Sequence, residues 1–173
     1  LVAVEENPNI KGLITILNTV GGGVEAGLAL AELVSTLSKP TVSLVLGGGH
    51  SIGIPLATAS KYSFIAESAT MTLHPIRMTG LVIGAEPTYD YFRKMQDRVL
   101  DFITRTSMAD RDQLSKLMNA TDNMAADIGT ILVGHEAVDL GLIDEVGGLT
   151  QALSKLKSMI DKTTRVQKQK YKM

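Results

Sequence analysis

The stretch "GGGHSIGIP", residues 47–55, decides how the rest of the chain is interpreted. It follows residues 41–46, an apolar, partly β-branched run that predicts a buried strand. It leads into residues 51–61, which favour a helix. The glycines permit either close packing of the strand on this helix or presentation of Ser51 to a substrate. A serine at the start of a helix is commonly a cap, so both interpretations of Ser51 stay open.

A second glycine-rich turn, "TVGGGVEAG", has the same plan. It follows a predicted strand at residues 12–18 and precedes a helical pattern at residues 24–37. Two turns of this kind side by side can direct two free backbone N–H groups at one developing oxyanion. Alternatively, glycines 21–23 and 47–49 only allow close strand–helix packing. Neither turn fits the phosphate-loop or dinucleotide-binding patterns.

His74 is the best-placed general base in the sequence. It ends the apolar strand "TMTLH", and Pro75 stops that strand. A histidine at a strand end beside a glycine-rich turn can take a proton from a serine. The alternative is a hydrogen-bonded structural histidine. Of the other two histidines, we expect His50 to point away from Ser51, and His135 to be exposed at a helix start.

The remaining pattern predicts a single α/β domain. Strands alternate with helices, and 173 residues suit one domain. Residues 88–105 predict a long amphipathic helix, because residues 89, 92, 96, 99 and 103 share one stripe. Further helices are expected at residues 110–120 and 149–161. The chain opens on what reads as the end of a helix, so we expect its native start to be missing.

Composition excludes several classes of function. Apolar residues make up 45% of the chain, charged residues 20%, and the net charge of −1 argues against nucleic-acid binding. The absence of cysteine excludes disulfides, thiolate metal sites and cysteine nucleophiles. No apolar run approaches the length of a membrane span, and no signal segment opens the chain. We expect no metal, no cofactor and a cytoplasmic location.

Four segments, in order, resemble the Clp-type serine peptidases. These are "ILNTVGGGVEAGLALAE", "VSLVLGGGHSIGIPLATA", "ATMTLHP" and "EAVDLGLIDEV". The resemblance covers roughly residues 1–160. Within the family, "LVLGGGHSIG", "HPIRMTGLVIG" and "DIGT" are similar to its translocation-enhancing branch.

The resemblance implies a fold and most of a site. The fold would be the ClpP/crotonase type, built of repeated β-β-α units with a protruding long helix. Residues 1–160 would form the peptidase domain, without its N-terminal strand, and residues 161–173 a basic, frayed tail. Ser51 would be the nucleophile and His74 the base. Gly22 and Ile52 would donate the oxyanion-hole N–H groups, with Gly21 beside them.

The third member of a catalytic triad is less well matched. Counting back without gaps from "EAVDLGLID" places the family's aspartate on Gly129. The nearest acid is Asp127, two residues earlier, and it is our candidate for this role. The arginine that follows the family's aspartate and helps to join two rings is absent, which argues against two-ring assembly.

The resemblance thus implies a serine endopeptidase acting on peptides or unfolded polypeptides. It also implies a homo-oligomeric ring, an ATPase partner and a link to protein translocation. A second interpretation is an acyl-CoA enzyme of the crotonase type, because residues 39–68 also resemble that family's oxyanion-hole region. Crotonases often rely on carboxylates there, and residues 47–59 contain no acid. A third is a catalytically altered scaffold.

Overall fold

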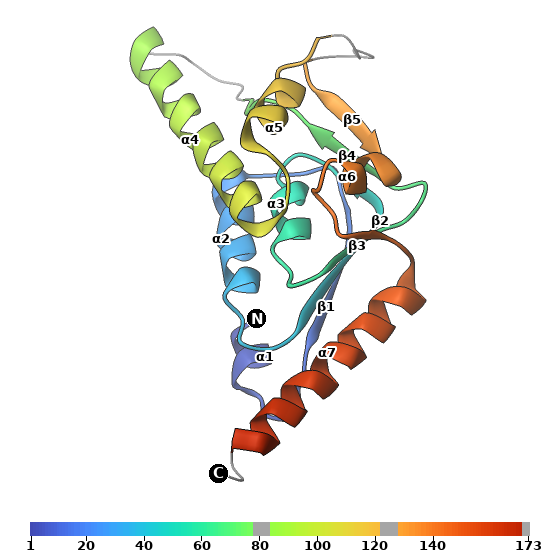
Figure 1. The fold of residues 1–173 in the computed structure, drawn as a ribbon. Coiled ribbons are helices and arrows are strands. Elements are labelled where there is room, and N and C mark those ends of the chain that lie inside the picture. Colours follow the sequence, from blue (N-terminus) through green and yellow to red (C-terminus); the bar gives the residue numbers. More distant parts are fainter. Residues whose placement is uncertain (78–83, 122–127, 171–173) are drawn as a thin grey trace.

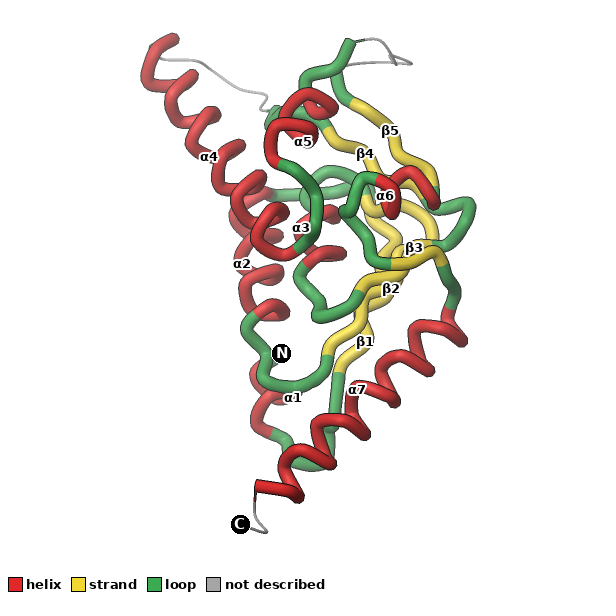
Figure 2. The backbone as a smooth tube through the Cα atoms, viewed as in Figure 1, coloured by secondary structure: helices red, strands yellow, loops and turns green. Residues whose placement is uncertain are grey.

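A computed structural model describes residues 1–77, 84–121 and 128–170 of the chain (Figure 1). Helices and strands alternate along it, as the sequence predicts, and the long helix α4 is present (Figure 2). The elements in chain order are α1 (Val2–Glu6), β1 (Leu13–Thr19), α2 (Val24–Ser35), β2 (Thr41–Gly49), α3 (Gly53–Thr58), β3 (Ser63–Ile65), β4 (Thr70–Leu73), α4 (Ala85–Thr106), α5 (Arg111–Met118), β5 (Thr130–Val133), α6 (His135–Asp139), β6 (Glu145–Val146) and α7 (Leu149–Lys170).

Strand β2 is the centre of the sheet. Its first half pairs in parallel with β1 on one side and β3 on the other. Its last residues pair with β4, which carries β5 as an antiparallel neighbour. Strand β6 extends the sheet beyond β3. Because β1, β2 and β4 all end near one point, the turns that follow these strands meet there.

Helices cover both faces of this sheet, with α2, α3 and α4 on one side and α7 on the other (Figure 2). Successive side chains of β2 alternate between the two faces, as the pleat requires. Val45 packs into the larger core, with residues from α2, α3, α4 and α5. Val42 and Leu44 pack into a smaller core against Ala152 and Leu156 of α7. The first five residues of β2 are therefore buried on both faces of the sheet.

The glycine run of β2 corrects one prediction. Residues 47–49 continue the strand, whereas the sequence indicates a turn. The pairing of β1 with β2 is irregular here: Leu17 lies opposite Val45, and Thr19 lies opposite Gly49. The side chain of Asn18 occupies the space beside Gly47, where a Cβ atom would lie 2.5 Å from Asn18 Oδ1. The turn that carries Ser51 is therefore shorter than expected.

The two longest helices have different surroundings. Val99 and Ile103 of α4 are buried in the larger core, while Tyr89 near its start is 67% exposed. The start of α4 projects beyond the sheet (Figure 1). Helix α7 continues through residue 170, across a segment where the sequence predicts a frayed tail. Among the described residues, no helix is both long and apolar enough to cross a bilayer.

Candidate active site

Ser51 occupies the turn between β2 and α3 in a left-handed backbone conformation, with φ of 56°. Left-handed φ is uncommon outside glycine and is kept only where neighbouring contacts enforce it. Here the Ser51 N–H donates to the carbonyl of Thr72 on β4 (2.9 Å), and the His50 N–H donates to the carbonyl of Thr19 on β1 (3.2 Å). Helix α3 is capped at Ile52 without a side-chain hydrogen bond, so the helix-cap interpretation of Ser51 is wrong.

Gly21 in the first turn lies directly against Ser51. A Cβ atom at position 21 would lie 2.9 Å from Ser51 Cβ, and Gly21 has φ of +106°. Its N–H donates to Thr19 Oγ1 at the end of β1 (3.1 Å). No other residue type fits this backbone and this spacing without strain. The first glycine turn therefore brings the chain into contact with the nucleophile candidate.

Two backbone donors next to these residues are unused. In the described parts of the chain, neither the Gly22 N–H nor the Ile52 N–H donates to a protein group. Both residues line one cavity with Ser51. The Ile52 side chain is buried against α2, where Gly27 leaves room for it: a Cβ atom at position 27 would lie 2.2 Å from Ile52 Cγ1. Free N–H groups fixed in this way can bind an oxyanion.

His74 follows the last residue of β4 and is partly buried. Its Nδ1 lies 2.7 Å from the carbonyl oxygen of Pro75. A carbonyl oxygen can only accept, so Nδ1 carries the hydrogen in this bond and Nε2 keeps a lone pair. Nε2 is therefore the nitrogen that can accept a proton.

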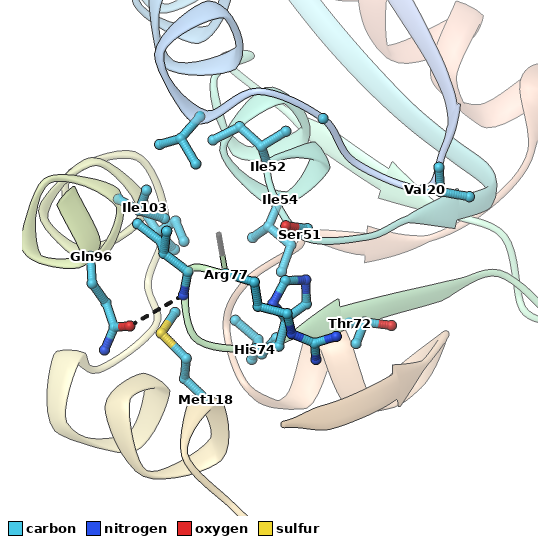
Figure 3. A pocket seen from close by; sticks show the side chains of 15 residues that line it. Val20, Ser51, Ile52, Ile54, Thr72, His74, Arg77, Gln96, Ile103 and Met118 are labelled. Carbon is cyan, nitrogen blue, oxygen red and sulfur yellow. Dashed lines mark hydrogen bonds between the residues drawn. The ribbon is translucent and has the colours of Figure 1, made fainter. Parts of the chain in front are cut away.

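Ser51 and His74 both line one cavity of about 270 Å³ (Figure 3). Its walls are mostly apolar side chains from α3, from the segment after His74, from α4 and from α5. Besides Ser51 and His74, the polar residues are Thr72, Arg77 and Gln96, and no described lining residue is an acid. The residues around the cavity are Val20, Gly22, Val24, Ser51, Ile52, Ile54, Thr72, Leu73, His74, Ile76, Arg77, Gln96, Val99, Ile103 and Met118.

The other two histidines have different surroundings. His50 Nδ1 lies 2.7 Å from Thr72 Oγ1, and its ring packs on Gly48, where a Cβ atom would be 2.7 Å away. His50 thus links β2 to β4. His135 is exposed and begins α6, which confirms the prediction for it.

The two candidate positions for a triad acid have different outcomes. Asp127 lies outside the described residues. Gly129 has φ of +134°, and its backbone packs on the end of β4. A Cβ atom at position 129 would lie 2.3 Å from the carbonyl oxygen of Leu73 and 2.9 Å from His74 Cβ. The position reached by ungapped counting therefore adjoins His74 but has no room for a side chain.

Sequence reasoning missed several features of the cavity. Gln96 Oε1 accepts from the Ile76 N–H (3.4 Å), which ties α4 to the segment after His74. Arg77 Nη2 donates to the carbonyl of Ile128 (3.3 Å), ahead of β5. From the sequence "HPIR" alone, one could predict only that a polar residue, Arg77, follows the strand. Among the described residues, no group of three or more histidines or acids could hold a metal.

A protein-family model and several known proteins are similar to this chain. The Clp protease family model matches residues 1–150. The chain is 59% identical over 162 residues to the translocation-enhancing protein TepA of Halalkalibacterium halodurans, covering 94% of this chain and 63% of that protein. It is 25% identical over 142 residues to the ATP-dependent Clp protease proteolytic subunit 1 of Chlamydia pneumoniae, covering 79% of this chain and 70% of that one.

Another relative is a putative protease of Methanocaldococcus jannaschii, 28% identical over 182 residues, with 90% of this chain and 58% of that protein covered. The chain thus spans less than two thirds of the length of the TepA relative. These matches confirm the family and the branch that the sequence motifs indicate.

Proposed function

Because the chain belongs to the Clp protease family, we propose that it is a serine peptidase that cleaves peptides or unfolded polypeptides. One observation carries the proposal. Ser51, His74 and the unused N–H groups of Gly22 and Ile52 line a single cavity. These are the parts that acyl transfer requires: a nucleophile, a base and two oxyanion donors.

The proposed reaction has two steps. Ser51 Oγ attacks the peptide carbonyl carbon while His74 Nε2 takes the hydroxyl proton, and the Gly22 and Ile52 N–H groups bind the oxygen that becomes negative. The tetrahedral intermediate collapses, the C–N bond breaks, and His74 gives its proton to the leaving amine. In the second step, a water molecule gives its proton to His74 and attacks the acyl-enzyme ester. The ester bond breaks, and His74 returns the proton to Ser51 Oγ. The apolar walls suit a hydrophobic substrate side chain.

The cavity argues against the acyl-CoA alternative. Crotonase-type chemistry with carboxylate bases needs an acid beside the two donors, and no described lining residue is one. The labelling experiment below distinguishes a peptidase from a scaffold without activity.

A fluorophosphonate probe tests the proposal. We expect the probe to label the parent protein at Ser51, and Ser51→Ala and His74→Ala to lower labelling by about 10⁴-fold or more. Ser158→Ala and His135→Ala, both at exposed positions away from the cavity, serve as matched controls and should label like the parent. A folded parent protein that the probe does not label would support the scaffold and end the peptidase proposal.

Assembly, partners and location belong to the same proposal. We propose that the chain forms a homo-oligomeric ring in the cytoplasm, works with an ATPase partner and, like the relative named translocation-enhancing, acts in protein translocation. Secretion of a reporter protein, compared between cells carrying the parent and cells carrying Ser51→Ala, tests the link to translocation. Equal secretion in both would show that any role in translocation does not depend on peptidase activity.

A further inference from the structure

The hydrogen bond between His74 and Pro75 lies where a catalytic triad has the bond from histidine to its acid. In a triad, that bond fixes the tautomer and orientation of the histidine ring and stabilises the imidazolium. The Pro75 carbonyl oxygen, 2.7 Å from His74 Nδ1, fixes the tautomer because it can only accept. The bond joins neighbouring residues, so it forms without help from another element.

The packing around Gly129 leaves no space for a side-chain acid at that position. Thr130 pairs with Leu73 across the β4–β5 ladder, so residue 129 falls beside His74. Its backbone approaches the Leu73 carbonyl so closely that even a Cβ atom would lie 2.3 Å from that oxygen. The Gly129 N–H is bonded to the Ala120 carbonyl at 2.9 Å, which holds this segment in place.

Among the described residues that line the cavity, the charged one is Arg77, a cation. Arg77 lies beside His74 in Figure 3, and its guanidinium donates to the Ile128 carbonyl. Within the described ranges, the His74 ring is hydrogen-bonded to the Pro75 carbonyl oxygen.

We propose that the backbone carbonyl of Pro75 positions the His74 ring, so that Ser51 and His74 work as a dyad without a carboxylate. This inference rests on the proposed peptidase function. During acylation the Ser51 proton moves to Nε2, the Nδ1–H stays on the Pro75 carbonyl, and Nε2 then gives its proton to the leaving amine. A neutral carbonyl stabilises the imidazolium less than a carboxylate does, so acylation is slower than in a full triad.

Substitution of the candidate acid gives the first test. In Asp127→Asn, we expect the rate of fluorophosphonate labelling to stay within about threefold of the parent, with the same pH profile. If Asp127 were the acid of a triad, its replacement would instead lower the labelling rate about 10⁴-fold. A loss of 100-fold or more in folded Asp127→Asn, with a reactive parent, would overturn the dyad and leave the peptidase proposal standing. An unreactive parent would overturn both.

Weakening the carbonyl itself gives the second test. Replacing Ile76 with its α-hydroxy acid turns the Pro75–Ile76 peptide bond into an ester, whose carbonyl is a poorer acceptor. We expect the maximal labelling rate to fall by about fivefold, the value of one ordinary hydrogen bond, with the half-saturating probe concentration unchanged. The ester also removes the Ile76 N–H that donates to Gln96, so Gln96→Leu is the matched control. A maximal labelling rate equal to that of Gln96→Leu would contradict the proposal.

Discussion

The backbone conformation of Ser51 is stabilised by contacts on three sides. A left-handed residue other than glycine costs on the order of 1–2 kcal/mol, which the hydrogen bonds to β1 and β4 offset. The third side is Gly21, whose missing side chain leaves room for Ser51 Cβ. The position of the hydroxyl is therefore set by residues far apart in the sequence.

Gly21→Ala should damage the site more than the fold. The new methyl group would meet Ser51 and the His50 carbonyl, and φ of +106° is strained for alanine. We expect the free energy of unfolding to fall by about 1–3 kcal/mol and fluorophosphonate labelling to fall by at least about tenfold. Gly23→Ala is the matched control, since Gly23 has φ of −68° and nothing lies within 4 Å of its Cβ position. Equal labelling of the two variants would argue against close contact between Gly21 and Ser51.

At the scale of elements, exposed ion pairs connect α2 to α4, which forms one wall of the cavity. Arg98 pairs with Glu25 (2.6 Å), and Arg105 pairs with Glu32 (2.7 Å). The hydrogen bonds from Arg98 hold the pKa of the Glu25 carboxyl below its ordinary value of 4.5. All four side chains are at least half exposed, so each pair adds little to stability.

The lowered pKa of Glu25 predicts a pH-dependent stability difference. A carboxyl whose pKa is lower in the folded state contributes stability above its unfolded pKa, and this is lost as the pH falls through the folded pKa. Glu25→Gln should therefore lower the melting temperature slightly at pH 7. That difference should shrink as the pH falls below 4.5. Glu86→Gln, at an exposed position on α4, is the control. A difference that persists unchanged at low pH would contradict this account.

Much of the site follows from the order of elements. Ser51 follows β2 and His74 follows β4. Because β2 and β4 pair in parallel, the residues after both strands lie at the same edge of the sheet. The extension of β2 through its glycines could not be predicted, because glycine weakens strands and only the Asn18 contact explains it. The hydrogen bond to the Pro75 carbonyl could not be predicted either, since every residue has a backbone carbonyl and no residue type indicates this contact.

At the scale of the whole molecule, the projecting start of α4 is the feature best suited to assembly. Tyr89 and Tyr91 are 67% and 54% exposed there, whereas the buried residues of the same helix begin at Met95. Exposed aromatic side chains on a projecting element are typical of interfaces. Residues 99 and 103 of the predicted stripe serve the chain's own core instead.

Polar substitution of these tyrosines tests whether α4 mediates the proposed ring. The parent should have a native mass several times that of one chain, and the double variant Tyr89→Ser, Tyr91→Ser should shift toward the monomer. The melting temperature of the double variant should change little, because neither side chain is buried. Lys94→Ser, at an exposed position on the same helix, should assemble like the parent. Unaltered mass in the double variant would place the interface elsewhere.

The irregular pairing of β1 with β2 has a consequence for insertions and deletions. Between the pairs Leu17–Val45 and Thr19–Gly49, β2 has three residues (46–48) where β1 has one, Asn18. The two extra residues are absorbed before Gly49, which pairs with Thr19, so Ser51 lies against Gly21 of the first glycine turn. Among natural variants of this chain, the length of residues 45–51 should therefore be invariant, whereas the connection from α2 to β2 is free to change length.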